Sequence, residues 1–187
     1  MKVFIYRLFY TLLALSLVFF VYAVNNGITL DNIAAKLEWT SVSQWIENYI
    51  PSYCSYVLYF SILIGFALLL RYASRTLPYI GIPNGNIISV EPASDGMMIT
   101  YFGLFFFALS VNTSQALMIT FILLLFCLLF SNVYMFNPLF SIIQYRFYYI
   151  TFKSGKKCLL ISKEKFSHGD ALVFERLYKL NEFTYID

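Results

Sequence analysis

The stretch LFYTLLALSLVFFVYAV, residues 8–24, decides what kind of protein this is, because it carries no charged side chain. A helix rises 1.5 Å per residue and needs about 20 residues to cross a hydrocarbon core of about 30 Å. The uncharged run continues beyond residue 24, so it predicts a membrane-spanning helix over about residues 8–27. A cleaved signal peptide is the alternative, because Lys2 and Arg7 make a basic leader and VYA at 21–23 loosely resembles a cleavage site. The apolar stretch is long for a signal peptide, which favours a retained anchor.

The composition of the whole chain agrees with this interpretation. Of its 187 residues, 60% are hydrophobic and only 12% are charged, whereas about 25% are charged in soluble domains. A domain of this size could not bury such long apolar runs, so lipid must be the solvent. The net charge of +3 and the three cysteines exclude a strongly basic nucleic-acid-wrapping protein and a disulfide scaffold.

Further uncharged runs predict three more spans. One run is centred on residues 53–71, and another, residues 96–145, is too long for a single crossing. The polar tetrapeptide NTSQ at 112–115 divides the longer run into two helices, and Pro138 is expected to close the second of them. The predicted fold class is therefore a membrane all-α protein, with a transmembrane region in residues 1–144 and spans at about residues 8–27, 53–71, 97–111 and 116–136.

The basic residues predict the orientation of the four spans. With the N-terminus in the cytoplasm, twelve of the thirteen Lys and Arg residues fall on the cytoplasmic side, and only Lys36 lies outside. The outer loop, residues 25–52, also carries Asp31, Glu38 and Glu47 and so has a net charge of 1 − 3 = −2. Both termini are therefore expected in the cytoplasm.

The outer loop contains two short amphipathic candidates. In the second, after the potential capping residues Thr40 and Ser41 and before Pro51, apolar residues recur at helical spacing. This pattern is typical of a helix on the outer headgroup surface, with Trp45 and Tyr49 as interfacial anchors. The loop is either a sensor of an external stimulus or a structural clip between two spans. The recurring apolar residues are Val42, Trp45, Ile46, Tyr49 and Ile50.

The C-terminal residues 145–187 predict a small cytoplasmic β module. Aromatic and β-branched residues at 145–152 and KCLLIS at 157–162 flank a turn and indicate a hairpin. Residues 171–177 and 183–186 suit a second hairpin, although 170–180 could also be helical. In the loop 71–96, which is rich in turn residues, only 86–92 favours an extended segment.

The sequence offers no catalytic constellation, and we expect neither an enzyme nor a cofactor or metal site. The lone His168 lies in a turn without cysteines or paired carboxylates nearby, and Cys54, Cys127 and Cys158 fall on segments that cannot meet within one chain. The segment GIPNGN at 81–86 lacks the lysine and the following helix of a phosphate-binding loop.

The spans themselves argue against transport, because no charged side chain lies inside them, and Arg71 stands only at the end of the second. Ser61 and Gly65 have the spacing of small residues that pack helices together. A pore across an oligomer is the alternative, and its polar lining would be Ser61, Thr100, Ser110 and Thr120.

A patch of five lysines follows the last span, at Lys153, Lys156, Lys157, Lys163 and Lys165. Such a patch attracts anionic lipid or an acidic partner surface, and the alternative is a solvated hairpin tip. Acidic residues nearby dilute the field, so direct nucleic-acid binding is not expected.

A family resemblance is carried by the four-span plan with a β-rich tail and by three segments, ISVEPA at 88–93, TYFGLFFFALSV at 100–111 and GKKCLLISK at 155–163. The resemblance is to the membrane subunit of the bacterial Kiwa anti-phage defence system. It implies a multi-pass protein of the bacterial inner membrane that forms a homo-oligomer, with a tetramer as one candidate. It also implies detection of phage infection and a cytosolic DNA-binding partner subunit (KwaB-like).

Residues and resemblance together predict a non-enzymatic sensor and anchor that recruits or controls a cytosolic DNA-binding effector. The alternative is an oligomeric channel or membrane-permeabilising protein. The tail is the expected partner platform.

Overall fold

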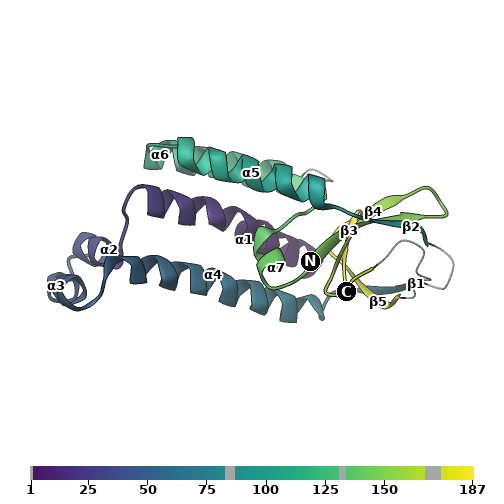
Figure 1. Ribbon diagram of the computed structural model, residues 1–187, viewed down its shortest axis with the longest axis horizontal. Coiled ribbons are helices and arrows are strands. Elements are labelled where there is room, and N and C mark those ends of the chain that lie inside the picture. Colours follow the sequence, from purple (N-terminus) through teal and green to yellow (C-terminus); the bar gives the residue numbers. More distant parts are fainter. Residues whose placement is uncertain (1, 83–86, 131–133, 167–173) are drawn as a thin grey trace.

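The computed structural model describes residues 2–82, 87–130, 134–166 and 174–187. Long helices lie side by side along the molecule, and a β-sheet sits at one end of them (Figure 1). Two short helices lie at the opposite end. The chain is therefore mostly helical, with one small mixed sheet.

The first helix, α1 (Lys2–Asn25), is the centre of the helical region. It packs against α4 (Ser52–Ser74), α5 (Ser94–Ser110) and α6 (Ser114–Phe130). Nine residues of α1 are buried, against three of α4, so α1 supplies the core and the other helices surround it.

All four predicted apolar helices are present, but they differ in length. Among the described residues, only α1 and α4 are long and apolar enough to cross a membrane on length and composition alone, while α5 and α6 have 17 residues each. The fourth helix was predicted to reach about residue 136, and this is wrong, because α6 ends at Phe130 and residues 134–137 are not helical.

The prediction that Pro138 closes the last helix is also wrong. Pro138 is the first residue of a further helix, α7 (Pro138–Ile142). Proline suits that position because its missing N–H would have no partner in the first turn. The side chain of Asn137 caps the helix by accepting a hydrogen bond from the backbone N–H of Leu139 at 3.0 Å.

The outer loop contains the two expected short helices, α2 (Leu30–Lys36) and α3 (Thr40–Tyr49). The sequence predicts Thr40 and Ser41 as capping residues of α3, and this is wrong. The N-cap is Trp39, whose side chain makes no capping hydrogen bond. No residue of α3 is buried, as expected for a helix on a surface. The serine hydroxyl of Ser55 in α4 accepts a hydrogen bond from the backbone of Leu30 at 3.1 Å and ties this segment to the bundle.

The sheet has six strands in the order β1-β5-β6-β4-β3-β2. The tail supplies β3 (Arg146–Phe152), β4 (Lys157–Ser162), β5 (Phe174–Lys179) and β6 (Thr184–Ile186). The loop after α4 supplies the two outermost strands, β1 (Tyr79–Ile82) and β2 (Ile87–Pro92). The sequence indicated only one extended segment there and did not predict that it pairs with the tail.

Both predicted hairpins are present. β3 and β4 pair antiparallel around the turn 153–156, in which Gly155 takes a φ of +78° that favours glycine. β5 and β6 also pair antiparallel, so residues 174–179 are a strand and not a helix, and this strand extends two residues beyond the predicted end at residue 177. β6 pairs parallel with β4. His168 and residues 171–173 lie outside the described residues.

Candidate functional site: the junction between helices and sheet

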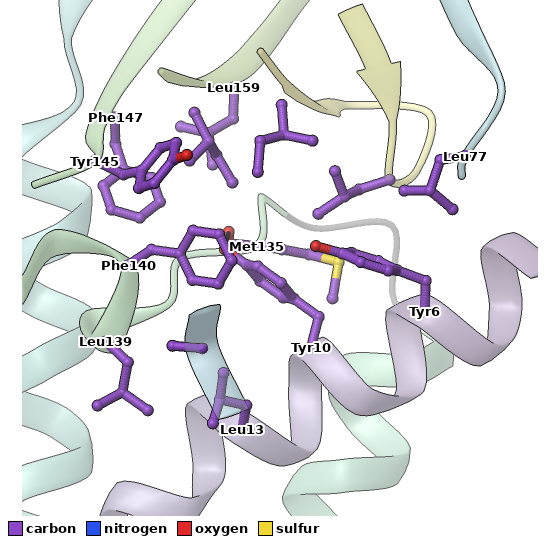
Figure 2. Packing of buried hydrophobic residues seen from close by; sticks show 14 of the residues in the cluster. Tyr6, Tyr10, Leu13, Leu77, Met135, Leu139, Phe140, Tyr145, Phe147 and Leu159 are labelled. Carbon is purple, nitrogen blue, oxygen red and sulfur yellow. Dashed lines mark hydrogen bonds between the residues drawn. The ribbon is translucent and has the colours of Figure 1, made fainter. Parts of the chain in front are cut away.

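The largest cluster of buried apolar residues lies where the helices meet the sheet, and we call it the junction (Figure 2). It combines residues from α1, α4 and α7, the segment 134–137 and one face of the sheet. The sheet therefore packs directly against the helix ends and is not attached to them through a linker alone. The junction includes Tyr6, Tyr10, Leu13, Leu77, Met135, Leu139, Phe140, Tyr145, Phe147, Leu159, Ile161, Leu180 and Ile186.

Tyr10 of α1 lies at the centre of the junction and is 1% exposed. Its hydroxyl donates to the carbonyl oxygen of Met135 at 3.2 Å, and its ring packs on Phe140 with centroids 5.2 Å apart (Figure 2). The amide of Asn137 donates back to the carbonyl oxygen of Tyr10 at 3.3 Å. Because these polar groups are buried, leaving any of them unpaired would cost about 1–3 kcal/mol.

Arg71 joins the end of α4 to the sheet. Its Nη2 donates to the backbone carbonyl of Asp187 at 2.8 Å, and its Nε donates to the hydroxyl of Tyr145, whose ring lies 5.5 Å from the guanidinium carbon. The third nitrogen donates to the hydroxyl of Ser74 at 2.8 Å. A guanidinium fork can hold several acceptors in fixed geometry, which a lysine cannot. Arg71 therefore fixes the residue before β3 and the residue after β6 to one helix end.

A second arginine fixes α6 to α1. The Nη2 of Arg7 donates to the carbonyl oxygen of Leu128 at 3.1 Å, in the last turn of α6, where carbonyls lack helical partners. At the other end of the same pair, the hydroxyls of Tyr22 and Ser114 lie 3.2 Å apart. The two helices are thus held together at both ends.

Gly96 permits α5 to approach the sheet closely. A Cβ atom at this position would lie 2.6 Å from the hydroxyl oxygen of Tyr149 and 3.1 Å from the ring of Phe136. No larger residue fits without displacing one of these side chains, so the first turn of α5 rests directly on β3.

The five predicted lysines are exposed, and the structure does not gather them into one patch. Lys153, Lys156 and Lys157 lie at the end of the β3–β4 hairpin that points away from the helices, whereas Lys163 and Lys165 follow the other end of β4 (Figure 1). Three of them are placed over rings, Lys156 over Phe183, Lys157 over Tyr149 and Lys163 over Tyr145. Lys157 also pairs with Glu91 at 3.6 Å.

The predicted outer anchors lie on α3, at the end of the molecule farthest from the sheet (Figure 1). Trp45 and Tyr49 are 56% and 73% exposed, and their ring centroids are 5.7 Å apart. The pair forms one exposed aromatic surface.

The candidate pore residues are only partly brought together. Thr100 and Thr120 line the same cavity of about 610 Å³ between α1, α5 and α6. Ser61 and Ser110 are exposed, and their hydroxyls donate to carbonyls of their own helices at 2.7 and 2.8 Å.

Groups with chemical reactivity are scarce in the described part of the chain. No cluster of three or more His, Cys, Asp or Glu residues that could hold a metal is found there. The three cysteines form no disulfide. Burial raises the pKa of the Cys158 thiol, with Lys156 and Lys179 opposing the shift, so little nucleophilic thiolate forms at neutral pH.

The residues that build the junction were not singled out from the sequence. The pair Asn137 and Pro138 did carry a usable signal, because a capping residue followed by proline is typical of a helix start. No such signal marks Arg71, Tyr10 or Gly96, because their partners lie far away in the sequence.

Comparison with known proteins gives one finding. The family model of the anti-phage protein KwaA matches residues 6–186, which includes every junction residue named above. No curated protein and no solved structure shows significant similarity to the chain. Because the match covers nearly the whole chain and agrees with the Kiwa resemblance in the sequence, the protein belongs to the KwaA family of anti-phage proteins.

Proposed function

We propose that this chain is a non-enzymatic, multi-pass inner-membrane subunit that senses a stimulus at its outer segment and holds a cytosolic DNA-binding effector at its sheet. It acts as a homo-oligomer in anti-phage defence. Membership of the KwaA family supports the defence role. The contacts of the helices and of the junction support the other parts of the proposal.

The pairing of α6 with α1 supports four spans. From Arg7 to Tyr22, α1 is about 22 Å long, and from Leu128 to Ser114 α6 is about 21 Å long. The contacts at 3.1 and 3.2 Å join the two helices at both ends of these stretches. If α1 crosses the membrane, α6 crosses the same thickness beside it, and the sheet lies on the cytoplasmic side with both termini.

The observation that carries the proposal is an unbroken packed connection from the outer helices to the sheet. Leu30 of α2 bonds to Ser55 near the start of α4, and Arg71 near the end of α4 bonds to Tyr145 and Asp187. A displacement of α2 and α3 therefore reaches the sheet through one rigid helix. Packed contacts and rigid helices of this kind can carry coupling between two distant sites.

The distal end of the β3–β4 hairpin is the best candidate for holding the effector. β3 has seven residues, so this end lies about 20 Å from the helix ends, beyond the headgroup region. Lys153 and Lys156 there favour an acidic protein surface over lipid.

The test is co-purification of the cytosolic subunit with the full-length membrane protein. Changing both Lys153 and Lys156 to Glu should weaken the complex and remove its salt dependence, whereas changing Lys36 to Glu in the outer loop should leave it intact. If the double variant forms the complex as well as the wild type does, the hairpin is not part of the interface.

A channel is the second candidate, because Thr100 and Thr120 share one cavity. Ion flux through liposomes containing only this protein, lost in Thr120→Leu, would favour it over the sensor.

A further inference from the structure

A second apolar cavity, of about 390 Å³, opens between α1, α4, α5 and α7. Val18, Phe60 and Leu104 are typical of its wall, and only Tyr101 and Ser141 among its lining residues carry hydroxyl groups. A volume of a few hundred Å³ with an apolar wall and few polar groups is typical of sites for small or amphiphilic ligands.

This cavity has a neighbour on the side of the sheet. The neighbouring pocket, of about 270 Å³, is lined by Ser94 and Met97 of α5 and also by Ser141. The two spaces share Ser141, and Met97 lies one helical turn before Tyr101 on the same face of α5. An apolar space within the helices therefore adjoins, at Ser141, a more polar space at the junction.

The polar space has a positive charge at its edge. Arg146, the first residue of β3, lines the pocket and is exposed. The ion pair recorded among the described residues is that of Lys157 with Glu91, elsewhere in the sheet. Asp95 accepts a hydrogen bond from the hydroxyl of Ser94 at 3.4 Å, and the backbone carbonyl of Glu164 accepts one from the hydroxyl of Tyr148, so both acidic residues lie beside the pocket. Neither carboxylate is among its lining residues. An arginine binds a phosphate group through two parallel N–H groups, so the charge and shape match a phosphodiester.

We propose that the two cavities open into each other at Ser141 and bind one phospholipid with an anionic headgroup from the cytoplasmic leaflet. One acyl chain fills the apolar cavity, and the phosphate lies at Arg146, with Ser94 and Ser141 beside the headgroup. This inference rests on the membrane embedding argued above. The lipid touches α5, α7 and β3 together, so its presence affects how the sheet is seated.

Native mass spectrometry of the full-length protein in mild detergent tests the site. With added phosphatidylglycerol we expect one retained lipid per chain, in preference to phosphatidylethanolamine. Arg146→Gln should lower retention of phosphatidylglycerol about fivefold, the loss expected for one basic residue at a membrane surface. Lys153→Gln removes the same charge from the distal hairpin and should change nothing. Glycerol 3-phosphate, which has the phosphate but no acyl chain, should not compete.

A second variant tests the apolar half. Ser141→Phe fills the passage between the two spaces and should abolish retention of both lipids, with folding checked by thermal melting. Equal retention in Arg146→Gln and the wild type overturns the inference. The inference is also overturned if the wild-type protein retains no lipid and the Ser141→Phe variant has a different oligomeric mass. That result would show that a second copy of the chain covers the cavity. If topology reporters place the sheet outside the cytoplasm, the proposed function fails as well.

Discussion

Arg71 is the residue on which most of the junction depends. It makes three hydrogen bonds through three different nitrogens, to a side chain of its own helix, to Tyr145 and to the backbone of Asp187. A lysine would keep the charge but could not reach all three acceptors. The junction therefore depends on the shape of this group as much as on its charge.

Arg71→Lys should destabilise the protein by about 1.5–3 kcal/mol, because hydrogen bonds from a charged donor are lost at a partly buried site. The melting temperature of the detergent-solubilised protein measures this. Arg75→Lys, one turn later, is the matched control, since the side chain of Arg75 is exposed and its guanidinium lies over the ring of Tyr72. Equal melting temperatures for the two variants would contradict the role of Arg71.

Gly96→Ala should destabilise the protein by about 1 kcal/mol, the lower end for overpacking, because the flexible end of Tyr149 can yield. Gly103→Ala on the same helix meets nothing within 4 Å and should be neutral or stabilising. Adding Tyr149→Phe should rescue Gly96→Ala, because it removes the hydroxyl oxygen that clashes. A Gly96→Ala protein as stable as Gly103→Ala would show that α5 does not rest on the sheet.

At the scale of elements, local sequence patterns predicted the helices and the hairpins, whereas the pairing of distant segments was not predicted. The uncharged runs predicted four helices, and segments rich in aromatic and β-branched residues on either side of turns predicted both tail hairpins. β1 and β2 are short, and their pairing with β5 and β3 joins segments more than 50 residues apart along the chain. No local pattern encodes such a contact. For the same reason the site residues Arg71 and Tyr10 could not be found, because each is defined by partners from another part of the chain.

The helix α3 is expected to lie on the outer membrane surface with its aromatic pair in the headgroup region. The chain has two tryptophans, so Trp39→Phe leaves Trp45 as the only one. In liposomes, lipids brominated near the headgroup should quench its fluorescence strongly, and lipids brominated at the end of the chain only weakly. Fluorescence that neither lipid quenches would place α3 away from the membrane and free to contact an external molecule.

At the scale of the whole molecule, the proposed orientation rests on the placement of twelve of the thirteen basic residues on one side. A periplasm-active reporter inserted between Lys36 and Glu38 should be active, and the same reporter after Asp187 should be inactive. A cytoplasm-active reporter should give the opposite result at both positions. Two active periplasmic fusions would leave an odd number of crossings and contradict the proposed four spans.

The exposed surface of the helices predicts association in the membrane. Only three residues of α4 are buried, and Gly65 has open space around it, so the face bearing Ser61 and Gly65 is unused within one chain. Close packing of small residues is what joins helices in lipid. Mass measurement in mild detergent should give a symmetric homo-oligomer, and Gly65→Leu should shift it toward monomer. A wild-type protein that stays monomeric at every concentration would exclude this arrangement.

The position of β6 has a consequence for how the protein is made. This strand has three residues, all buried, and it lies between β5 and β4 in the middle of the sheet. While the ribosome is still synthesising the chain, the helices emerge first and can enter the membrane one after another, but β4 and β5 have no strand between them until residue 186 has left the exit tunnel. The junction therefore closes only after synthesis of the region is finished. Premature termination a few codons before Thr184 would leave the helices intact and divide the sheet into two halves.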